Sequence, residues 1–147
     1  MKILVINGPN LNMLGNREPA IYGATTLEEI ESSLRRKALS IGVEVDFYQS
    51  NIEGELIERI QKAPAQGFRA FVINPGGYTH TSVALRDALI AVELPFIEVH
   101  LSKVSAREPF RQINLFSDIA AGSISGFGPL GYILALEAVW GLYGKKA

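Results

Sequence analysis

The sequence predicts an α/β fold in which helices cover a parallel β-sheet. Short apolar runs, such as 3–6 and 70–73, alternate along the chain with amphipathic stretches such as 27–41, which is typical of alternating strands and helices. Runs that are apolar at every position indicate strands buried on both faces of a parallel sheet. With 147 residues, of which 48% are hydrophobic, the chain has the length of one domain, and we expect a single domain over residues 1–147.

The predicted elements follow one another in a regular order. We expect strands at 3–6, 43–48, 70–73, 96–101 and 120–125, and helices at 27–41, 55–63, 83–92 and 131–142. The strand at 43–48 alternates apolar and charged residues, so we expect it at or near an edge of the sheet.

Two helices carry clear start signals. Thr26 and Glu29 have the spacing of a capping box, and Gly42 ends that helix. Its buried face is expected to hold Leu27, Ile30, Leu34 and Leu39. Ser82 is expected to cap the helix at 83–92. The buried stripe of that helix is expected to hold Ala84, Leu85, Ala88, Leu89 and Val92.

Composition excludes several kinds of chemistry. The chain has no cysteine and only two histidines, which excludes disulfides, thiolate catalysis, and zinc sites that need cysteine or three histidines. Its 14 basic and 15 acidic residues leave a net charge of −1, whereas nucleic-acid-coating proteins are basic, so no nucleic-acid partner is expected. The apolar runs are too short to cross a membrane and no signal-peptide pattern follows Met1, so we expect a cytoplasmic protein that does not bind membranes.

Polar residues follow each of the first four predicted strands. They occur at 7–12, 50–51, 74–81 and 100–102. Ligands of open parallel sheets bind beyond the carboxyl ends of the strands, so the sequence predicts a site at this edge.

The loop at 7–23 is too long for a tight connection between a strand and a helix, and loops of this length are usually functional or disordered. Arg17 supplies a permanent positive charge, and Tyr22 follows five residues later. A guanidinium next to a phenol favours the ionised phenol, which would make Tyr22 a usable base. The alternative is that Tyr22 only packs in the core.

The strand at 96–101 ends with a second polar group. Side chains alternate along a strand, so Glu98, His100 and Ser102 should project to the same side. A carboxylate beside a histidine can fix its tautomer and support the imidazolium form that a general acid requires. The alternative is a hydrogen-bonded histidine with a structural role only.

Two further segments could bind an anion. The Pro-Gly-Gly turn at 75–77 and the helix start after it could bring backbone N–H groups to a ligand, or could form only a helix cap near His80. Arg107 and Arg111 would share one face of a helical turn. The glycines at 126–131 match the letters of a dinucleotide-binding loop, but no βαβ unit follows them, and we treat this match as false.

Taken together, these segments resemble one family, the type II 3-dehydroquinate dehydratases. The matching segments include NGPNLN at 7–12, Arg17 with Tyr22, QSN at 49–51, NPGGYTHTSVALRD at 74–87, IEVHLS at 97–102, Arg107 with Arg111, and GFG at 126–128. They cover nearly the whole chain in order.

The resemblance implies a flavodoxin-like fold with a five-stranded parallel sheet flanked by helices. It also implies the trans-dehydration of 3-dehydroquinate to 3-dehydroshikimate through an enolate, without a metal or other cofactor, in a dodecamer built from trimers. The catalytic residues implied are Tyr22, His100, Arg17, Asn10, Asn12 and Glu98. The substrate-binding residues implied are Asn74, His80, Asp87, Leu101, Ser102, Arg107 and Arg111.

The implied roles differ among these residues. Tyr22 would take a proton from C2 of the substrate, and Arg17 would stabilise its ionised form and the enolate. His100 would protonate the departing C1 hydroxyl, oriented by Asn10 and Glu98. Asn12 would orient a water on the enolate oxygen and Asp87 would reach a neighbouring subunit's site.

The chain departs from the family pattern at three positions. Lys103 replaces the usual Asn, while Gln112 and Asn114 replace the usual His and Ser. Two alternative functions also remain at this stage, a flavin- or nucleotide-binding module and a receiver domain. A receiver domain needs acidic residues where this chain has Asn7 and Asn74.

Overall fold

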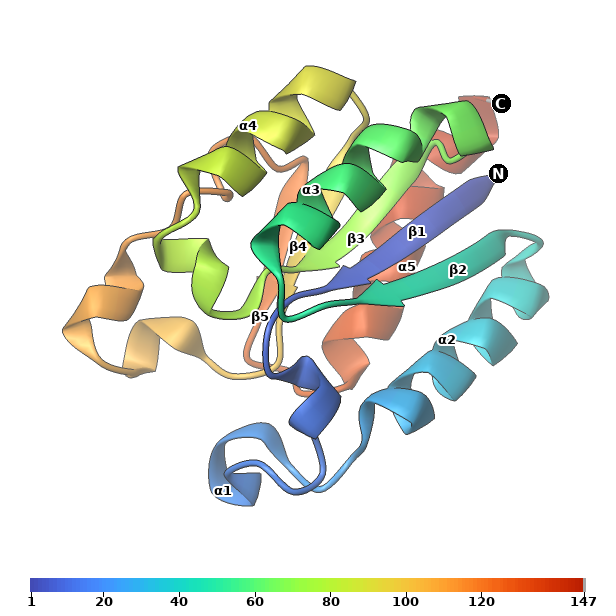
Figure 1. The fold of residues 1–147 in the computed structure, drawn as a ribbon. Helices are drawn as coiled ribbons and strands as arrows, with labels where there is room; N and C mark the ends of the chain where they lie inside the picture. Colours follow the sequence, from blue (N-terminus) through green and yellow to red (C-terminus); the bar gives the residue numbers. More distant parts are fainter. Residues whose placement is uncertain (147) are drawn as a thin grey trace.

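A computed structural model describes residues 1–146, which form a five-stranded parallel sheet with helices on both faces (Figure 1). The strands are β1 (Lys2–Asn7), β2 (Glu44–Gln49), β3 (Ala70–Asn74), β4 (Phe96–His100) and β5 (Gly122–Ser125). They pair in the order β2-β1-β3-β4-β5, and every pair is parallel. This order is that of the flavodoxin-like folds, so the predicted fold class is confirmed.

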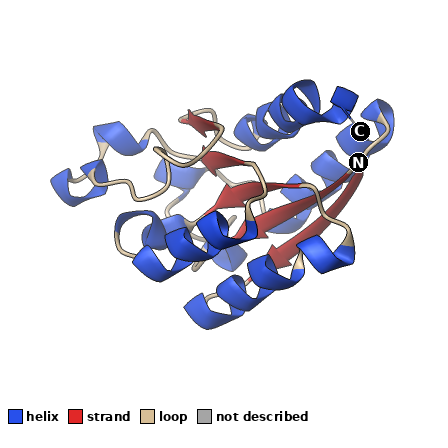
Figure 2. Ribbon diagram, turned by 90° about the horizontal axis from the view of Figure 1, so that it is seen from above, coloured by secondary structure: helices blue, strands red, loops and turns tan. Residues whose placement is uncertain are grey.

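Four helices of ten or more residues cover the sheet. They are α2 (Leu27–Ile41), α3 (Glu53–Lys62), α4 (Val83–Val92) and α5 (Leu130–Tyr143). Figure 1 shows α2 and α5 on one face and α3 and α4 on the other, and Figure 2 shows helices on both faces of the sheet. Within residues 1–146, none of the helices combines the length and the apolar character needed to span a membrane.

Shorter helical turns lie in the connections. They are α1 (Pro19–Tyr22) and the 3₁₀ turns η1 (Leu11–Met13), η2 (Pro64–Gln66), η3 (Gly76–His80), η4 (Val104–Ala106), η5 (Pro109–Gln112) and η6 (Gly144–Lys146). The predicted long loop after the first strand therefore contains η1 and α1. Figure 1 shows α1 projecting away from the sheet.

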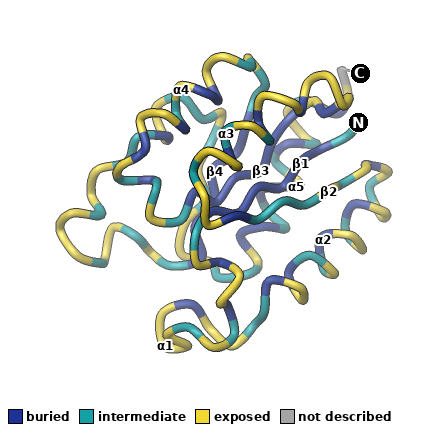
Figure 3. The backbone as a smooth tube through the Cα atoms, viewed as in Figure 1, coloured by how far each residue is buried: buried dark blue, intermediate teal, exposed yellow. Residues whose placement is uncertain are grey.

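Alternating side chains of the strands pack into two hydrophobic cores, one on each face of the sheet. In β1, Ile3 and Val5 pack with α2 and α5, whereas Leu4 and Ile6 pack with α3 and α4. All four are buried, and Figure 3 shows the central strands β1, β3 and β4 largely in the colour of buried residues. β2 forms one edge, as predicted, and its residue Glu44 is exposed.

The predicted helix caps are present. The Thr26 hydroxyl accepts a hydrogen bond from Glu29 N–H, and the Glu29 carboxylate accepts one from Thr26 N–H, which completes the capping box. Gly42 adopts the left-handed conformation (φ 73°) that ends α2. The Ser82 hydroxyl accepts a hydrogen bond from Leu85 N–H at the start of α4.

Two predicted core positions are wrong. Leu39 is 84% exposed, and its neighbour Ala38 faces the core instead. A spacing of four residues from Leu34 keeps a side chain on the same helix face, whereas a spacing of five turns it away. Ala84 is likewise exposed, because the buried face of α4 is formed by Leu85, Ala88 and Leu89.

The loop after β1 packs directly against the loop after β3. Gly8 N–H donates to the Asn74 carbonyl at 2.8 Å. A Cβ added at Gly8 would lie 2.3 Å from the Pro75 carbonyl oxygen, which is backbone and cannot turn aside. Only glycine therefore permits this approach, which brings the carboxyl ends of two central strands together.

We predict that Gly8→Ala lowers the free energy of unfolding by about 3 kcal/mol, near the upper end of the cost of overpacking. Gly141→Ala is the matched control, because its Cβ meets no atom within 4 Å and alanine stabilises a helix interior by up to about 1 kcal/mol. Denaturant unfolding measures both. Equal stability of Gly8→Ala and the unsubstituted chain would contradict the packing described.

Candidate active site

A cavity of about 160 Å³ opens at the carboxyl ends of β1, β3 and β4. The residues that line it come from the loop at 7–23, the turn after β3 and the segment after β4. They are Asn10, Leu11, Arg17, Tyr22, Asn74, Gly76, Gly77, His80, His100, Leu101, Ser102, Val104, Arg107 and Arg111. The cavity lies where ligands of this sheet topology bind, beside the switch between β1 and β3.

Tyr22 is held between two guanidinium groups on one side of the cavity. Arg17 Nη2 lies 3.2 Å and Arg107 Nη1 2.9 Å from the Tyr22 hydroxyl oxygen. Both guanidinium groups also stack on its ring, with their central carbons 4.3 and 5.3 Å from the ring centre. Guanidinium groups only donate, so the oxygen accepts from two cations.

Arg107 links this group to the segment after β4. Its Nη1 also lies 3.4 Å from the Ser102 hydroxyl. Sequence reasoning connected Tyr22 with Arg17, five residues away, but not with Arg107, which is 85 residues away. Only the tertiary fold brings the Arg107 guanidinium to the Tyr22 hydroxyl.

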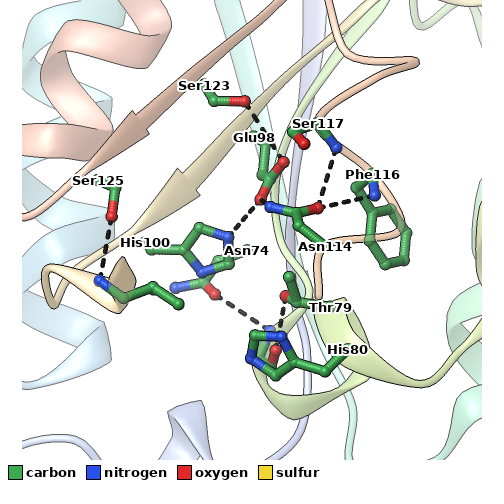
Figure 4. A network of polar contacts seen from close by, with 12 residues as sticks. Asn74, Thr79, His80, Glu98, His100, Asn114, Phe116, Ser117, Ser123 and Ser125 are labelled. Carbon is green, nitrogen blue, oxygen red and sulfur yellow. Dashed lines mark hydrogen bonds and ion pairs between the residues drawn. The ribbon is translucent and has the colours of Figure 1, made fainter. Parts of the chain in front are cut away.

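His100 and Glu98 form the second polar group, as the alternation along β4 predicted. His100 Nε2 lies 2.5 Å from Glu98 Oε1, and Glu98 is fully buried (Figure 4). A carboxylate accepts here, so the proton is on Nε2, and Nδ1 is the ring nitrogen available to a ligand. Asn114 Nδ2 donates to the same carboxylate oxygen at 2.6 Å, and the Ser123 hydroxyl lies 3.4 Å from the other oxygen.

His80 reaches the cavity from η3. Its Nδ1 lies 2.6 Å from the Ile113 carbonyl oxygen. A carbonyl can only accept, so Nδ1 carries the proton, and Nε2 is the nitrogen free to contact a ligand.

Asn74 at the end of β3 is fixed from behind the cavity. Its Nδ2 donates to the Tyr132 hydroxyl at 3.0 Å, and its Oδ1 accepts from Gly76 N–H at 3.1 Å. The Tyr132 hydroxyl in turn donates to Asn7 Oδ1 at 2.6 Å. Burial raises the pKa of the Tyr132 hydroxyl far above its usual value, which keeps it protonated as this donor.

Positive charge dominates the cavity wall, since Arg17, Arg107 and Arg111 all line it. Arg111 also pairs with Glu108, and this hydrogen bond holds the pKa of the Glu108 carboxyl below its usual range. The arrangement suits a small anionic ligand.

Three residues that the sequence nominated do not line this cavity. Asn12 is exposed in η1, and Asp87 is exposed on α4. Glu98 lies behind His100 and is reached from the cavity only through the imidazole. Asn10 lines the cavity in the left-handed conformation (φ 69°), with its backbone N–H donating to Asn51 Oδ1 at 2.9 Å.

Sequence reasoning missed the role of Tyr132. Its only signal was a phenol in a mostly apolar helix, where a buried hydroxyl requires a partner. No group of three or more side chains suited to metal binding occurs within the part of the chain that the structure describes.

Comparison with known proteins identifies the family. The model of the family described as Dehydroquinase class II matches residues 1–140. The chain belongs to this family. A 3-dehydroquinate dehydratase of Methylococcus capsulatus is 60% identical over 136 residues, which are 92% of this chain and 92% of the relative. A catabolic 3-dehydroquinase of Aspergillus oryzae is 57% identical over 137 residues, which are 93% of this chain and 89% of the relative.

Solved class II dehydroquinases share the fold. The type II dehydroquinase from Butyrivibrio crossotus superposes with a TM-score of 0.92 at 48% identity, over 95% of this chain and 97% of that one. The enzyme from Propionibacterium acnes gives a TM-score of 0.89 at 40% identity, over 94% of each chain. Membership of this family sets aside the flavin-binding and receiver-domain alternatives.

We predict that Tyr132→Phe lowers the free energy of unfolding by about 1–3 kcal/mol, because it leaves two buried amide groups without their partner. Tyr143→Phe in the same helix is the control, since Tyr143 is only half-buried. Denaturant unfolding measures both. A Tyr132→Phe variant as stable as the control would contradict the hydrogen-bonded chain from Asn7 to Asn74.

Proposed function

We propose that this dehydroquinase removes water from 3-dehydroquinate by trans elimination to give 3-dehydroshikimate, through an enolate intermediate and without a cofactor. The observation that carries the proposal is the composition of one cavity. It combines a phenol that accepts from two guanidinium groups with an imidazole backed by a buried carboxylate. Elimination next to a ketone needs one base and one acid, and these two groups provide them.

In the first step, Tyr22 acts as the base. Its ionised oxygen takes a proton from C2, and the electrons of the C2–H bond form the enolate with the C3 carbonyl. Arg17 and Arg107 lie at this oxygen, so positive charge is already in place when the negative charge moves from the phenol to the substrate. Asn12 would orient a water on the enolate oxygen; it lies in η1, next to the cavity residue Leu11.

In the second step, His100 acts as the acid. Its Nδ1 gives a proton to the C1 hydroxyl, the C1–O bond breaks, water leaves, and the enolate electrons form the C1–C2 double bond. Glu98 supports the positive imidazolium and fixes its tautomer. Asn10, on the same cavity wall, would help to orient the ring.

The remaining cavity residues would hold the substrate. Arg111 supplies a cation for the carboxylate, and Asn74 and His80 present an amide and a ring nitrogen. The backbone at Leu101 and the hydroxyl of Ser102 complete this set. Each polar side chain is held by a second contact, which favours a fixed substrate orientation.

The assembly is part of the same proposal. We propose a cytoplasmic dodecamer built from trimers, with residues 1–147 as one catalytic domain. Asp87, which is exposed on α4 and outside its own cavity, would contact a neighbouring subunit's site. Exposed apolar side chains such as Phe110 and Ile113 provide surface for subunit contacts. The absence of cysteine suits a reducing compartment.

We predict that adding the protein to 3-dehydroquinate produces ultraviolet absorption from the conjugated enone. Tyr22→Phe and His100→Ala should each lower kcat by roughly 10²–10⁴-fold, the contribution of a general base or acid. Tyr48→Phe, on the edge strand β2, is the control for loss of a hydroxyl and should retain full activity. No absorbance change with folded protein would refute the activity, and a normal rate in either variant would remove that residue from the mechanism.

We also predict that borohydride added together with 3-dehydroquinate leaves the enzyme active and its mass unchanged, because the scheme contains no imine. Lys103, which lines a second pocket that shares Tyr22 and Arg107 with the substrate cavity, is the residue to check by mass spectrometry. A reduced substrate adduct on Lys103 would replace the proposed mechanism with a Schiff-base mechanism.

A further inference from the structure

The Glu98 carboxylate is buried beneath the site, and three side chains satisfy it. His100 Nε2 and Asn114 Nδ2 lie 2.5 and 2.6 Å from the same oxygen, Oε1. The Ser123 hydroxyl lies 3.4 Å from the other oxygen. A buried carboxylate is stable only when such donors share its charge. No Lys or Arg within residues 1–146 pairs with Glu98, so the Asn114 amide is the main neutral donor.

The orientation of the Asn114 amide is fixed by the backbone that follows it. Its Oδ1 accepts hydrogen bonds from Phe116 N–H at 2.8 Å and Ser117 N–H at 3.0 Å (Figure 4). Both are donors, so this end of the amide must be the oxygen, and the end that faces Glu98 must be the NH₂ group. Phe116 is fully buried, which anchors the turn in the core.

Asn114 does not belong to the wall of the substrate cavity. That cavity is lined by His100 but by neither Glu98 nor Asn114. Asn114 instead lines an adjoining cavity together with Glu98 and Ser123, and His100 and Arg111 line both cavities. The contact that links Asn114 to the reacting groups is its hydrogen bond to Glu98.

We propose that Asn114 is a positioning residue that tunes the acid His100 through Glu98. Its N–H group shares the charge of the oxygen that also accepts the His100 Nε2 proton, and it holds the carboxylate in one orientation. Because both donors share one oxygen, the Asn114 contact changes the charge that Glu98 presents to the His100 Nε2–H group. The inference rests on the proposed role of His100.

Asn114→Asp separates this role from a structural one. Aspartate keeps an oxygen for the Phe116 and Ser117 N–H groups but loses the donor to Glu98. We expect kcat to fall about tenfold, a part of the contribution of a general acid, with KM changed less than about twofold because Asn114 does not contact the substrate. Asn114→Ala removes the donor without adding charge and should also lower kcat. It replaces the Asp variant in this test if the Asp variant does not fold.

Gln112→Glu is the matched control for added charge. Gln112 lies two residues away, is exposed, and donates to the Ser105 carbonyl rather than to Glu98. We expect this variant to keep the kcat of the unsubstituted chain. A loss equal to that of Asn114→Asp would overturn the inference, because charge alone would then account for it.

Imidazole ¹⁵N NMR provides a readout that does not depend on turnover. The chain contains only His80 and His100, so the spectrum has two rings, and the Gln112→Glu variant supplies the reference spectrum. We expect the Nε2 and Nε2–H signals of His100 to shift in both Asn114 variants but not in Gln112→Glu. Unchanged His100 signals together with an unchanged kcat would overturn the inference. If the unsubstituted chain did not convert 3-dehydroquinate, the proposed function would fail, and the NMR result would still decide whether Asn114 acts on His100.

Discussion

Parallel pairing of β1 with β3 at the centre of the sheet is the constraint on which the site depends. It places Asn7 beside Asn74 at the carboxyl ends of these strands. The loops that follow are held together by the contact between Gly8 and the Asn74–Pro75 backbone. Tyr132 joins the two asparagines from α5 beneath the sheet. The polar wall of the cavity is therefore built on buried backbone, and its position is set by the register of the sheet.

The two reacting groups have neighbours of opposite charge. Tyr22 lies beside cations, and its oxygen accepts from Arg17 and Arg107. His100 instead donates to the buried carboxylate of Glu98. An elimination that begins with proton removal and ends with proton donation needs this separation of charge in one cavity.

Local sequence signals predicted most of the fold because helix caps, helix ends and buried strands depend on residues close together in the sequence. The capping box at Thr26 and Glu29, the glycine stop at Gly42 and the buried run at 70–73 each depend on neighbours along the chain. Leu39 and Ala84 were predicted to be buried, but each is exposed next to a buried apolar neighbour, Ala38 and Leu85. Where two adjacent helix residues are both apolar, the sequence pattern does not show which of them faces the core. The residues at the ends of the strands were predicted to meet, and ten of the nominated residues do line one cavity.

What sequence could not predict are contacts made by residues far apart in the chain. Arg107 reaches Tyr22, and Asn114 reaches Glu98 from a segment that only the path of η4 and η5 brings under β4. Tyr132 lies in a mostly apolar helix, and nothing near it in the sequence indicated that its hydroxyl contacts Asn7 and Asn74. The contacts of all three residues depend on tertiary geometry, although Arg107 itself stands in a recognised motif.

The central claim, that Tyr22 as base and His100 as acid carry out a trans elimination, is tested most directly by stereochemistry. With 3-dehydroquinate deuterated stereospecifically at C2, the account predicts loss of the C2 hydrogen trans to the departing hydroxyl, whereas loss of the cis hydrogen would contradict it.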